Sequence, residues 1–215
     1  QNGRWDNFVF APTPSYRESN KLKWINHAQL VFEGGNEYRH FDTYSVYYAG
    51  TGVDRVRYDQ GEYHALLDID RSHQQGVYTH RYDANGQRLI NAERTQDVDT
   101  EAEYMWVHFA LPVEQPLMNQ TLYVGGDIFY NRLTAENRMN YDAENKLYWL
   151  NAYIKQGGAD YQYWAVNHAN GNKITLRQTE GSFWQTENEY TVYVYYRPLG
   201  ARADELVGLQ RVYSR

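Results

Sequence analysis

The side chains that could do chemistry in this sequence are carboxylates and histidines, and their spacing is the first question. Asp97, Asp99, Glu101 and Glu103 crowd into residues 95–103 and could offer oxygen ligands to calcium. The run lacks the glycine and the terminal bidentate glutamate of a helix-loop-helix calcium site. We therefore interpret it as a solvated loop between two domains and predict no metal there.

The remaining candidates for catalysis or metal binding are scattered. The seven histidines stand at positions 27, 40, 64, 73, 80, 108 and 168 without zinc-type spacing, and cysteine is absent. Asp68 and Asp70 precede Arg71, Ser72 and His73 but are expected at a strand end. His108 is expected to be a half-buried, hydrogen-bonded residue within a strand. No GxSxG turn offers a serine nucleophile. We predict no catalytic residue, no metal and no cofactor, and hence a protein that is not an enzyme.

The densest polar cluster on a structured background is GGNEYRHFDTYS, residues 34–45. Glu37, Arg39 and Asp42 in this stretch could line a recognition site. The alternative is that a Gly-Gly turn enters a strand and that Arg39 pairs with a carboxylate. We favour this second, structural interpretation.

Aromatic side chains are the more promising material for binding. The chain has 22 Tyr, six Trp and seven Phe. Tyr130, Trp149, Trp164 and Trp184 could stack on a sugar ring or anchor a protein interface if they are exposed. A sandwich of this size also needs large core residues, so for each Trp a place in the core is the favoured interpretation.

Composition limits the classes of partner and the compartment. The 215 residues carry a formal net charge of −6, and no basic stripe suggests nucleic acid as a partner. No apolar stretch approaches the length of a membrane-spanning helix. The chain starts at Gln1 without a leader, and residues 1–5 read as a strand end and a turn. We expect that a signal peptide and an upstream domain are missing.

The elements that must position these residues are predicted to be strands separated by Gly, Asn and Asp turns, of which Asn85-Gly86 is the clearest hairpin signal. We predict an all-β fold of two immunoglobulin-like (early-set type) antiparallel β-sandwiches, residues 1–96 and 97–215, hinged at 95–103. Strands are expected at residues 7–11, 22–32, 41–48, 54–59, 62–69, 77–82, 87–92, 104–111, 121–125, 138–141, 147–154, 159–166, 190–197 and 209–213. Two short helical turns are expected at 133–137 and 202–207.

The clearest strand pattern is that of residues 190–197, where β-branched and aromatic side chains alternate with a period of two. We expect both faces of this strand to be covered and the strand to hold the second sandwich together. The preceding loop, residues 180–189, is then the better place for recognition of a partner.

Several stretches resemble one known family. QNGRWDN, EGGNEYRHFDTYS, YMWVHFALP, the segment from LYVGGDIFYN to GGADYQYW, and EGSFWQTENEYTVYVYYRP are similar to the plug proteins of the type IX secretion system of Bacteroidota. The resemblance implies a secreted, periplasmic or outer-membrane-associated protein that binds the outer-membrane translocon and blocks its pore between transport events. On this expectation the contact surface includes some of Tyr44, Trp184 and residues 34–41.

A second resemblance covers only residues 103–166, which are similar to the early-set sandwiches of glycogen-binding modules. Tyr130-Asn131 stands at that pattern's FN step, but no Trp follows it, and Lys155 is the nearest basic candidate for a glucan contact. The alternative function is therefore a carbohydrate-binding module of a periplasmic or surface polysaccharide system, with a polysaccharide as the partner.

Overall fold

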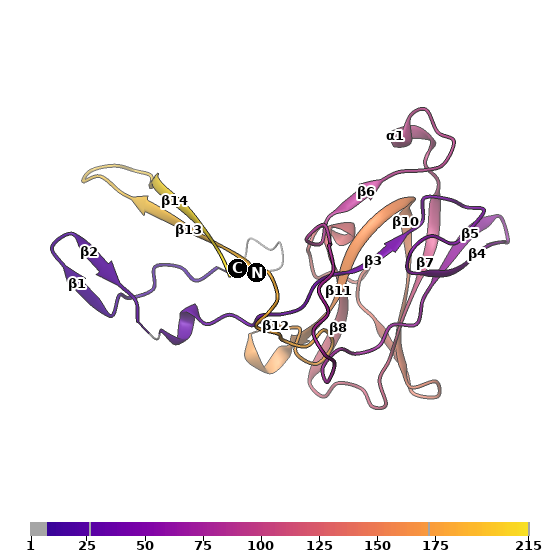
Figure 1. Ribbon diagram of the computed structural model, residues 1–215, viewed down its shortest axis with the longest axis horizontal. Helices are drawn as coiled ribbons and strands as arrows, with labels where there is room; N and C mark the ends of the chain where they lie inside the picture. The colour runs from indigo at the N-terminus through magenta and orange to yellow at the C-terminus, as the bar shows by residue number, and fades with distance from the viewer. Residues whose placement is uncertain (1–7, 26, 172, 215) are drawn as a thin grey trace.

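The computed structural model describes residues 8–25, 27–171 and 173–214, and regular structure in these ranges is almost entirely β-strand (Figure 1). The all-β prediction is confirmed. No helix of the described residues is long and apolar enough to cross a membrane. The strands are β1 (Tyr16–Glu18), β2 (Lys21–Lys23), β3 (Arg39–Asp42), β4 (Val53–Asp59), β5 (Glu62–Leu67), β6 (Arg88–Ile90), β7 (Tyr104–Pro112), β8 (Gln120–Gly125), β9 (Asn140–Asp142), β10 (Leu147–Lys155), β11 (Gly157–Asn167), β12 (Lys173–Thr175), β13 (Glu189–Tyr196) and β14 (Glu205–Tyr213); the helical pieces are α1 (Val98–Glu101) and the short turns η1 (Ala28–Leu30), η2 (Asp127–Phe129) and η3 (His168–Asn170).

The first sheet has the order β4-β5-β7-β10-β9. Its neighbouring strands are antiparallel except β5 and β7, which run parallel. In β7 and β10 every second residue is buried, as the alternation of a pleated strand requires. The sheet therefore has one face in the core and one face toward solvent; we call the second the outer face.

The second sheet is organised around β11. The first half of β11 pairs with β3 and β6, and its second half pairs with β8 and β12. Nearly every residue of β11 is buried, so this strand is covered on both faces. Such a strand reads as a continuous hydrophobic and aromatic run rather than as an alternation.

The core lies between the two sheets and is built from both halves of the sequence. Phe41 of β3 packs edge-on against Phe109 of β7 at 5.7 Å, and Phe109 packs against Tyr161 of β11 at 5.2 Å between ring centroids. All three side chains are almost completely buried. Their contacts join the two sheets into one sandwich.

The molecule does not follow the predicted boundary between residues 96 and 97. Strands from both sides of that boundary form both sheets, because β5 pairs with β7 and β3 pairs with β11. The expected interdomain hinge at 95–103 is the crossover from β6 to β7 and carries α1. Both halves have the same alternating pattern, and an alternating pattern does not specify which strands become neighbours.

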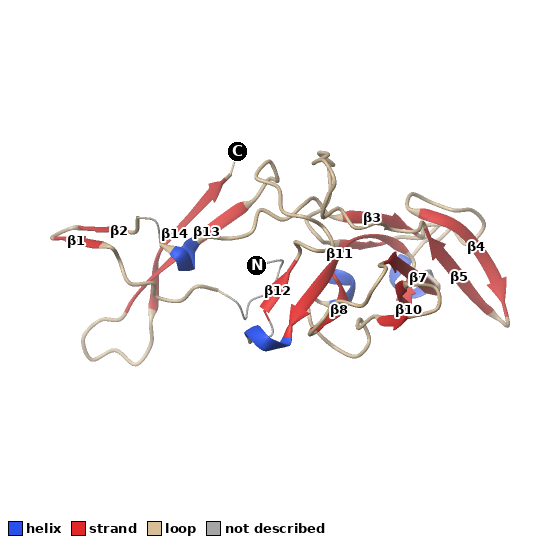
Figure 2. Cartoon of the chain, turned by 90° about the horizontal axis from the view of Figure 1, so that it is seen from below, coloured by secondary structure: helices blue, strands red, loops and turns tan. Residues whose placement is uncertain are grey.

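Two hairpins lie outside this sandwich. β1 pairs with β2 and β13 pairs with β14, each as a separate two-stranded sheet. Figures 1 and 2 both show these hairpins projecting from the same end of the molecule, away from the sandwich. We call the β13–β14 hairpin, residues 189–213, the arm.

The arm corrects one sequence-based expectation. Residues 190–197 do form a strand, but β13 pairs with β14 and does not join the sandwich, and its side chains are mostly exposed on both faces. A period of two defines a strand and says nothing of what covers it.

Other expectations on elements were wrong. Residues 8–11 and 77–82 form no strand, and neither does most of 22–32 or of 41–48. The segment 133–137 is not helical, and 205–207, expected to be helical, begin β14. Asn85 and Gly86 do form a turn with positive φ values of 54° and 80°, although only the strand after it exists. The strand end expected at residues 1–5 lies outside the described residues, as does Asn7.

Candidate functional site

A buried arginine lies at the centre of the most polar part of the molecule. Arg39, the first residue of β3, is 5% exposed and points to the same side of the strand as Phe41. Its Nε donates to Oε1 and Oε2 of Glu180 at 3.1 and 3.0 Å. Its Nη1 donates to Oδ1 of Asp70 at 2.8 Å, and its Nη2 donates to the carbonyl of Arg71 at 2.8 Å. A buried guanidinium needs such partners, since an unpaired charge in the interior is costly.

The second oxygen of Asp70 is held by two tyrosines of β11. The hydroxyls of Tyr161 and Tyr163 donate to Oδ2 of Asp70 at 2.7 and 2.6 Å. Burial, reinforced by the negative charge of Asp70, raises the pKa of both hydroxyls well above its ordinary value, so both keep the proton that they donate. The guanidinium of Arg39 also lies 5.3 Å from the ring centroid of Tyr163.

Glu180 is fully buried and accepts a further hydrogen bond from the backbone N–H of Tyr163 at 2.8 Å. Burial raises the pKa of its carboxyl group, and Arg39 acts against this by lowering it. For Arg39 itself, burial opposes the charged form, but Glu180 and Asp70 outweigh burial and raise the guanidinium's pKa. The group is therefore a charged network held together by its own hydrogen bonds.

This network joins two segments that are far apart in the sequence, residues 34–39 and 180–188. Nδ2 of Asn36 donates to the carbonyl of Glu180 at 3.0 Å, and the N–H of Phe183 donates to the carbonyl of Gly35 at 2.9 Å. Nδ2 of Asn188 donates to the carbonyl of Gly34 at 3.0 Å. The arm therefore starts from a base that is fixed on the Arg39 network.

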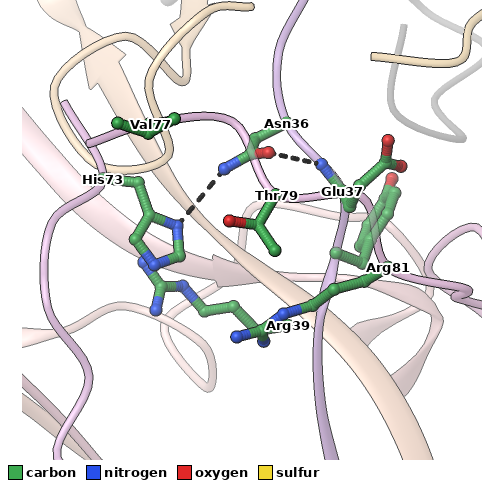
Figure 3. Close-up of a pocket in the computed structure, with 8 residues that line it drawn as sticks. Asn36, Glu37, Arg39, His73, Val77, Thr79 and Arg81 are labelled. Atoms are coloured by element: carbon green, nitrogen blue, oxygen red, sulfur yellow. Dashed lines mark hydrogen bonds between the residues drawn. The ribbon is translucent and has the colours of Figure 1, made fainter. Parts of the chain in front are cut away.

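Two adjacent cavities open beside Arg39. One, of about 120 Å³, is shown in Figure 3; the other, of about 250 Å³, lies next to it and shares Arg39, His73 and Arg81 with the first. The lining of the first comes from residues 36–39, at the start of β3, and from the loop 73–81. It consists of Asn36, Glu37, Tyr38, Arg39, His73, Val77, Thr79 and Arg81.

His73 is neutral in this cleft. Burial, together with the positive charges of Arg39 and Arg81, lowers the pKa of its imidazole to about 4. Nδ1 of His73 lies 3.3 Å from Nδ2 of Asn36, which is a donor, so Nδ1 accepts and Nε2 carries the proton. The hydroxyl of Ser72 donates to the carbonyl of Gln178 at 2.7 Å. The cleft can therefore donate hydrogen bonds to a ligand, but Ser72 and His73 do not form a nucleophile and base pair.

The structure brings together two of the three polar residues singled out from the sequence. Glu37 and Arg39 line the same cleft, and Glu37 accepts a hydrogen bond from Tyr78. Asp42 lies at the other end of β3, where its Oδ1 accepts from the N–H of Tyr44 at 2.7 Å. The interpretation that Arg39 pairs with a carboxylate is confirmed.

Sequence reasoning missed the partners of Arg39. Glu180 and Asp70 lie 141 and 31 residues away along the chain, and neither had a pattern that marks a buried carboxylate. The only available signal was the position of Arg39, two residues before Phe41 in a strand, which places a charge on the buried face.

The four aromatic candidates do not form one surface. Trp164 is fully buried, and its ring lies so close to Gly125 that a Cβ there would stand 1.9 Å from it. Trp149 is 38% exposed on the outer face, Tyr130 is 65% exposed after η2, and Trp184 is 81% exposed before the arm. The expectation of a core position is thus confirmed for Trp164 and wrong for Trp149 and Trp184.

Two carboxylates of the acidic run at 95–103 accept hydrogen bonds from backbone N–H groups at the start of α1. Oδ1 of Asp97 accepts from the N–H of Asp99 at 3.0 Å, and Oε2 of Glu101 accepts from the N–H of Gln96 at 2.9 Å. Asp97 is thus the N-cap of the helix. Within 8–25, 27–171 and 173–214, no group of three or more His, Asp or Glu side chains could hold a metal ion.

The chain is similar to a protein of known structure. No protein-family model matches the chain, and no curated protein matches it. The crystal structure of a hypothetical protein from Parabacteroides merdae is similar, with a TM-score of 0.90 and 35% sequence identity over 99% of this chain. The match covers 53% of that protein, so this chain spans about half of its length. The similarity extends to the arm as well as the sandwich, because nearly the whole chain is aligned.

Proposed function

We propose that this protein is not an enzyme and acts by contact with a protein partner, as a plug or accessory subunit of the outer-membrane translocon of the type IX secretion system. The observation that carries the proposal is the arm, a hairpin whose apolar side chains face solvent on both sides. The proposed location is the periplasm or the periplasmic side of the outer membrane.

One face of the arm is aromatic and aliphatic. Tyr195 is 56% exposed beside its cross-strand neighbour Leu206 at 52%, and Leu209, 51% exposed, lies opposite Tyr193. Val192 and Val194, on the opposite face of the same strand, are 52% and 50% exposed. Contiguous exposed apolar side chains of this kind mark interaction surfaces in soluble proteins.

The arm gains from a partner for an energetic reason. A two-stranded hairpin without a packed face is marginally stable in water. A partner that covers even one face buries apolar surface, and each Å² buried stabilises the complex by about 25 cal/mol. Contact with the partner also orders the hairpin. The base of the arm is already fixed, because Asn188 is bonded to Gly34 beside the Arg39 network.

The choice of partner rests on the sequence resemblance to the plug proteins. Two of the strings that carry it, EGGNEYRHFDTYS and EGSFWQTENEYTVYVYYRP, contain the residues that meet at the Arg39 network and form the base of the arm. These strings therefore describe the part of the molecule that presents the arm. Trp184, 81% exposed in the second string, would extend the contact surface.

The test is retention of this chain by purified translocon immobilised on beads. We expect the chain to be retained and the double substitution Tyr195→Ser and Leu209→Ser to abolish retention, because it removes the apolar face of the arm. Tyr58→Ser is a matched control, since Tyr58 is 65% exposed but lies on β4, outside the arm.

Two results would count against the proposal. The first is no retention of the wild-type chain by the translocon. The second is equal retention of the arm variant and the wild type, which would show that binding uses another surface. Circular dichroism of each variant establishes that the sandwich is intact.

A further inference from the structure

The outer face of the first sheet carries a second set of exposed rings, separate from the arm. Alternation along β7 and β10 places Trp106 and His108 on this face together with Trp149, Asn151 and Tyr153. Trp149, Tyr153 and Tyr104 are 38%, 52% and 49% exposed. Aromatic residues thus follow the length of β10, over about 13 Å at 3.3 Å per residue.

Trp149 has small or polar cross-strand neighbours and no ring stacked on it in the described part of the chain. Its cross-strand neighbours are Ala110 on β7 and Asn140 on β9. A neighbour as small as Ala110 leaves space at the side of the indole. By contrast, the ring of Tyr153 is stacked on Tyr104 at 5.4 Å and packs against Trp106 at 5.1 Å.

Next to Trp149 lies a chain of hydrogen-bonding groups. Nδ1 of His108 donates to Oδ1 of Asn151 at 2.8 Å. Nε2 of His108 must then accept, and Nδ1 of His64 donates to it at 2.9 Å. Burial lowers the pKa of His108, and the neighbouring His64 acts in the same direction, so the imidazole is neutral.

This order of donors leaves two groups available at the ends of the chain. Nδ2 of Asn151 remains a donor, and Nε2 of His64 is the acceptor atom of the neutral imidazole; neither has a partner among the residues that the structure describes. Their strands, β5 and β10, are separated by two strand spacings, about 10 Å. Charged side chains reach this face on its β4–β5 side, where Arg57 lies opposite His64 and Oε2 of Glu62 accepts from Nε1 of Trp106 at 2.7 Å, and at the end of β10, where Lys155 lies beside Tyr104.

We propose that the outer face binds a neutral polysaccharide, with the Trp149 ring as the stacking platform and Asn151 and His64 as hydrogen-bonding groups for successive sugar units. The C–H bonds on one face of a pyranose are slightly positive and pack on the negative face of an indole. The hydroxyls at its rim need both donors and acceptors, which this face offers. The cross-strand neighbours of the Trp149 platform, Ala110 and Asn140, carry no charge, which favours a neutral chain over an acidic one.

A protein partner is the weaker interpretation of this face. Its aliphatic side chains are few, Leu66 and Ala110 among them, whereas the arm combines aliphatic and aromatic residues on both faces. The two surfaces therefore differ in chemistry, and the polysaccharide site does not depend on the function proposed for the arm.

The test is affinity electrophoresis of the whole chain in gels that contain amylopectin, xylan, glucomannan or β-1,3-glucan, followed by calorimetry with the best binder. We expect retardation by at least one of them. Trp149→Ala should weaken binding about tenfold or more, since it removes the stacking ring, and Asn151→Ala severalfold. Tyr82→Ala, at a position that is 98% exposed and outside this face, should bind as the wild type does.

Three results would overturn the proposal: no retardation by any of the four polysaccharides, wild-type affinity of both Trp149→Ala and Asn151→Ala, or equal binding to the acidic polymer polygalacturonate. If Trp149→Ala does not fold, Asn151→Ala still tests the proposal, because Asn151 is exposed and its substitution leaves the core unchanged. The arm variant Tyr195→Ser and Leu209→Ser should bind polysaccharide as the wild type does. Loss of polysaccharide binding can therefore be distinguished from loss of translocon binding.

Discussion

At the scale of single residues, Arg39 is the centre of a buried network of charged side chains. One guanidinium satisfies two carboxylates, and the tyrosine hydroxyls of β11 complete the arrangement. A buried ion pair is weak evidence for stability when it is compared with a hydrophobic core. Its effect is specificity, because segments 34–39 and 180–188 can meet in only one register if every group is to be paired.

Removing the arginine from this buried network tests whether the network is needed for folding. We expect Arg39→Met to lower the free energy of unfolding by about 3–5 kcal/mol, because Glu180 and Asp70 are left buried without a counter-charge. Adding Glu180→Leu should restore part of the loss. Urea unfolding followed by tryptophan fluorescence measures both. Arg55→Met, at an ion pair whose side chains are 67% and 52% exposed, should change stability little. A loss for Arg39→Met no larger than for Arg55→Met would show that the network is not needed for folding.

His73 makes stability depend on pH. Its pKa is about 4 in the folded protein and 6.5 in the unfolded chain, so the unfolded state binds more protons between these values. The contribution is complete above pH 6.5 and is lost as the pH falls toward 4. Because about a third of the side chain is exposed, at 35%, we expect an effect of about 1 kcal/mol rather than the full value of the shift.

The matching experiment compares unfolding free energies at pH 7 and pH 4.5 for the wild type and for His73→Asn, whose loss on acidification should be smaller. His40 provides a control of opposite sign. Its hydrogen bond to Asp160 raises its pKa, so its contribution is present at low pH and is lost as the pH rises. His40→Asn should therefore make the acid loss larger. If the unfolding free energy of His73→Asn depended on pH as that of the wild type does, the lowered pKa of His73 would be contradicted.

At the scale of elements, the close approach of residues 34–35 to 183–188 fixes the base of the arm. A Cβ on Gly34 would lie 2.1 Å from the carbonyl oxygen of Phe183, which is backbone and cannot move aside as a side chain would. Glycine is therefore required at position 34 for steric reasons.

We expect Gly34→Ala to lower the unfolding free energy by about 1–3 kcal/mol, the usual cost of overpacking. Thermal unfolding monitored by circular dichroism gives the measurement. Gly208→Ala is the control, because a Cβ there would meet Val194 at an ordinary 3.5 Å. Equal melting temperatures for Gly34→Ala and the wild type would mean that the two segments are not packed as described.

The elements also show what the sequence can predict. β4, β5, β7, β8, β10, β11 and β13 lie where alternation or a continuous apolar run indicated them. Their neighbours could not be predicted, because pairing partners are selected by packing over long sequence distances. The same holds for the site: Arg39 was singled out, whereas Asp70 and Glu180 reach it only through the tertiary fold.

At the scale of the whole molecule, one sandwich presents three different surfaces. The polar cleft beside Arg39 is anchored in the core, the outer face of the first sheet carries rings and neutral polar groups, and the arm projects from the end. These surfaces should differ in stability as well. The strands of the sandwich are paired on both sides or packed on the core, while β13 and β14 pair only with each other among the described strands.

Hydrogen exchange measured with and without the translocon tests the central claim, that the arm is the surface that binds a protein partner. In the free protein we expect amides of β13 and β14 to exchange much faster than those of β7, β10 and β11, because local opening of an uncovered hairpin costs little. With translocon added, amides of the arm should become protected while those of β7 and β10 keep their rates. Complex formation without added protection in residues 189–213 would contradict the account.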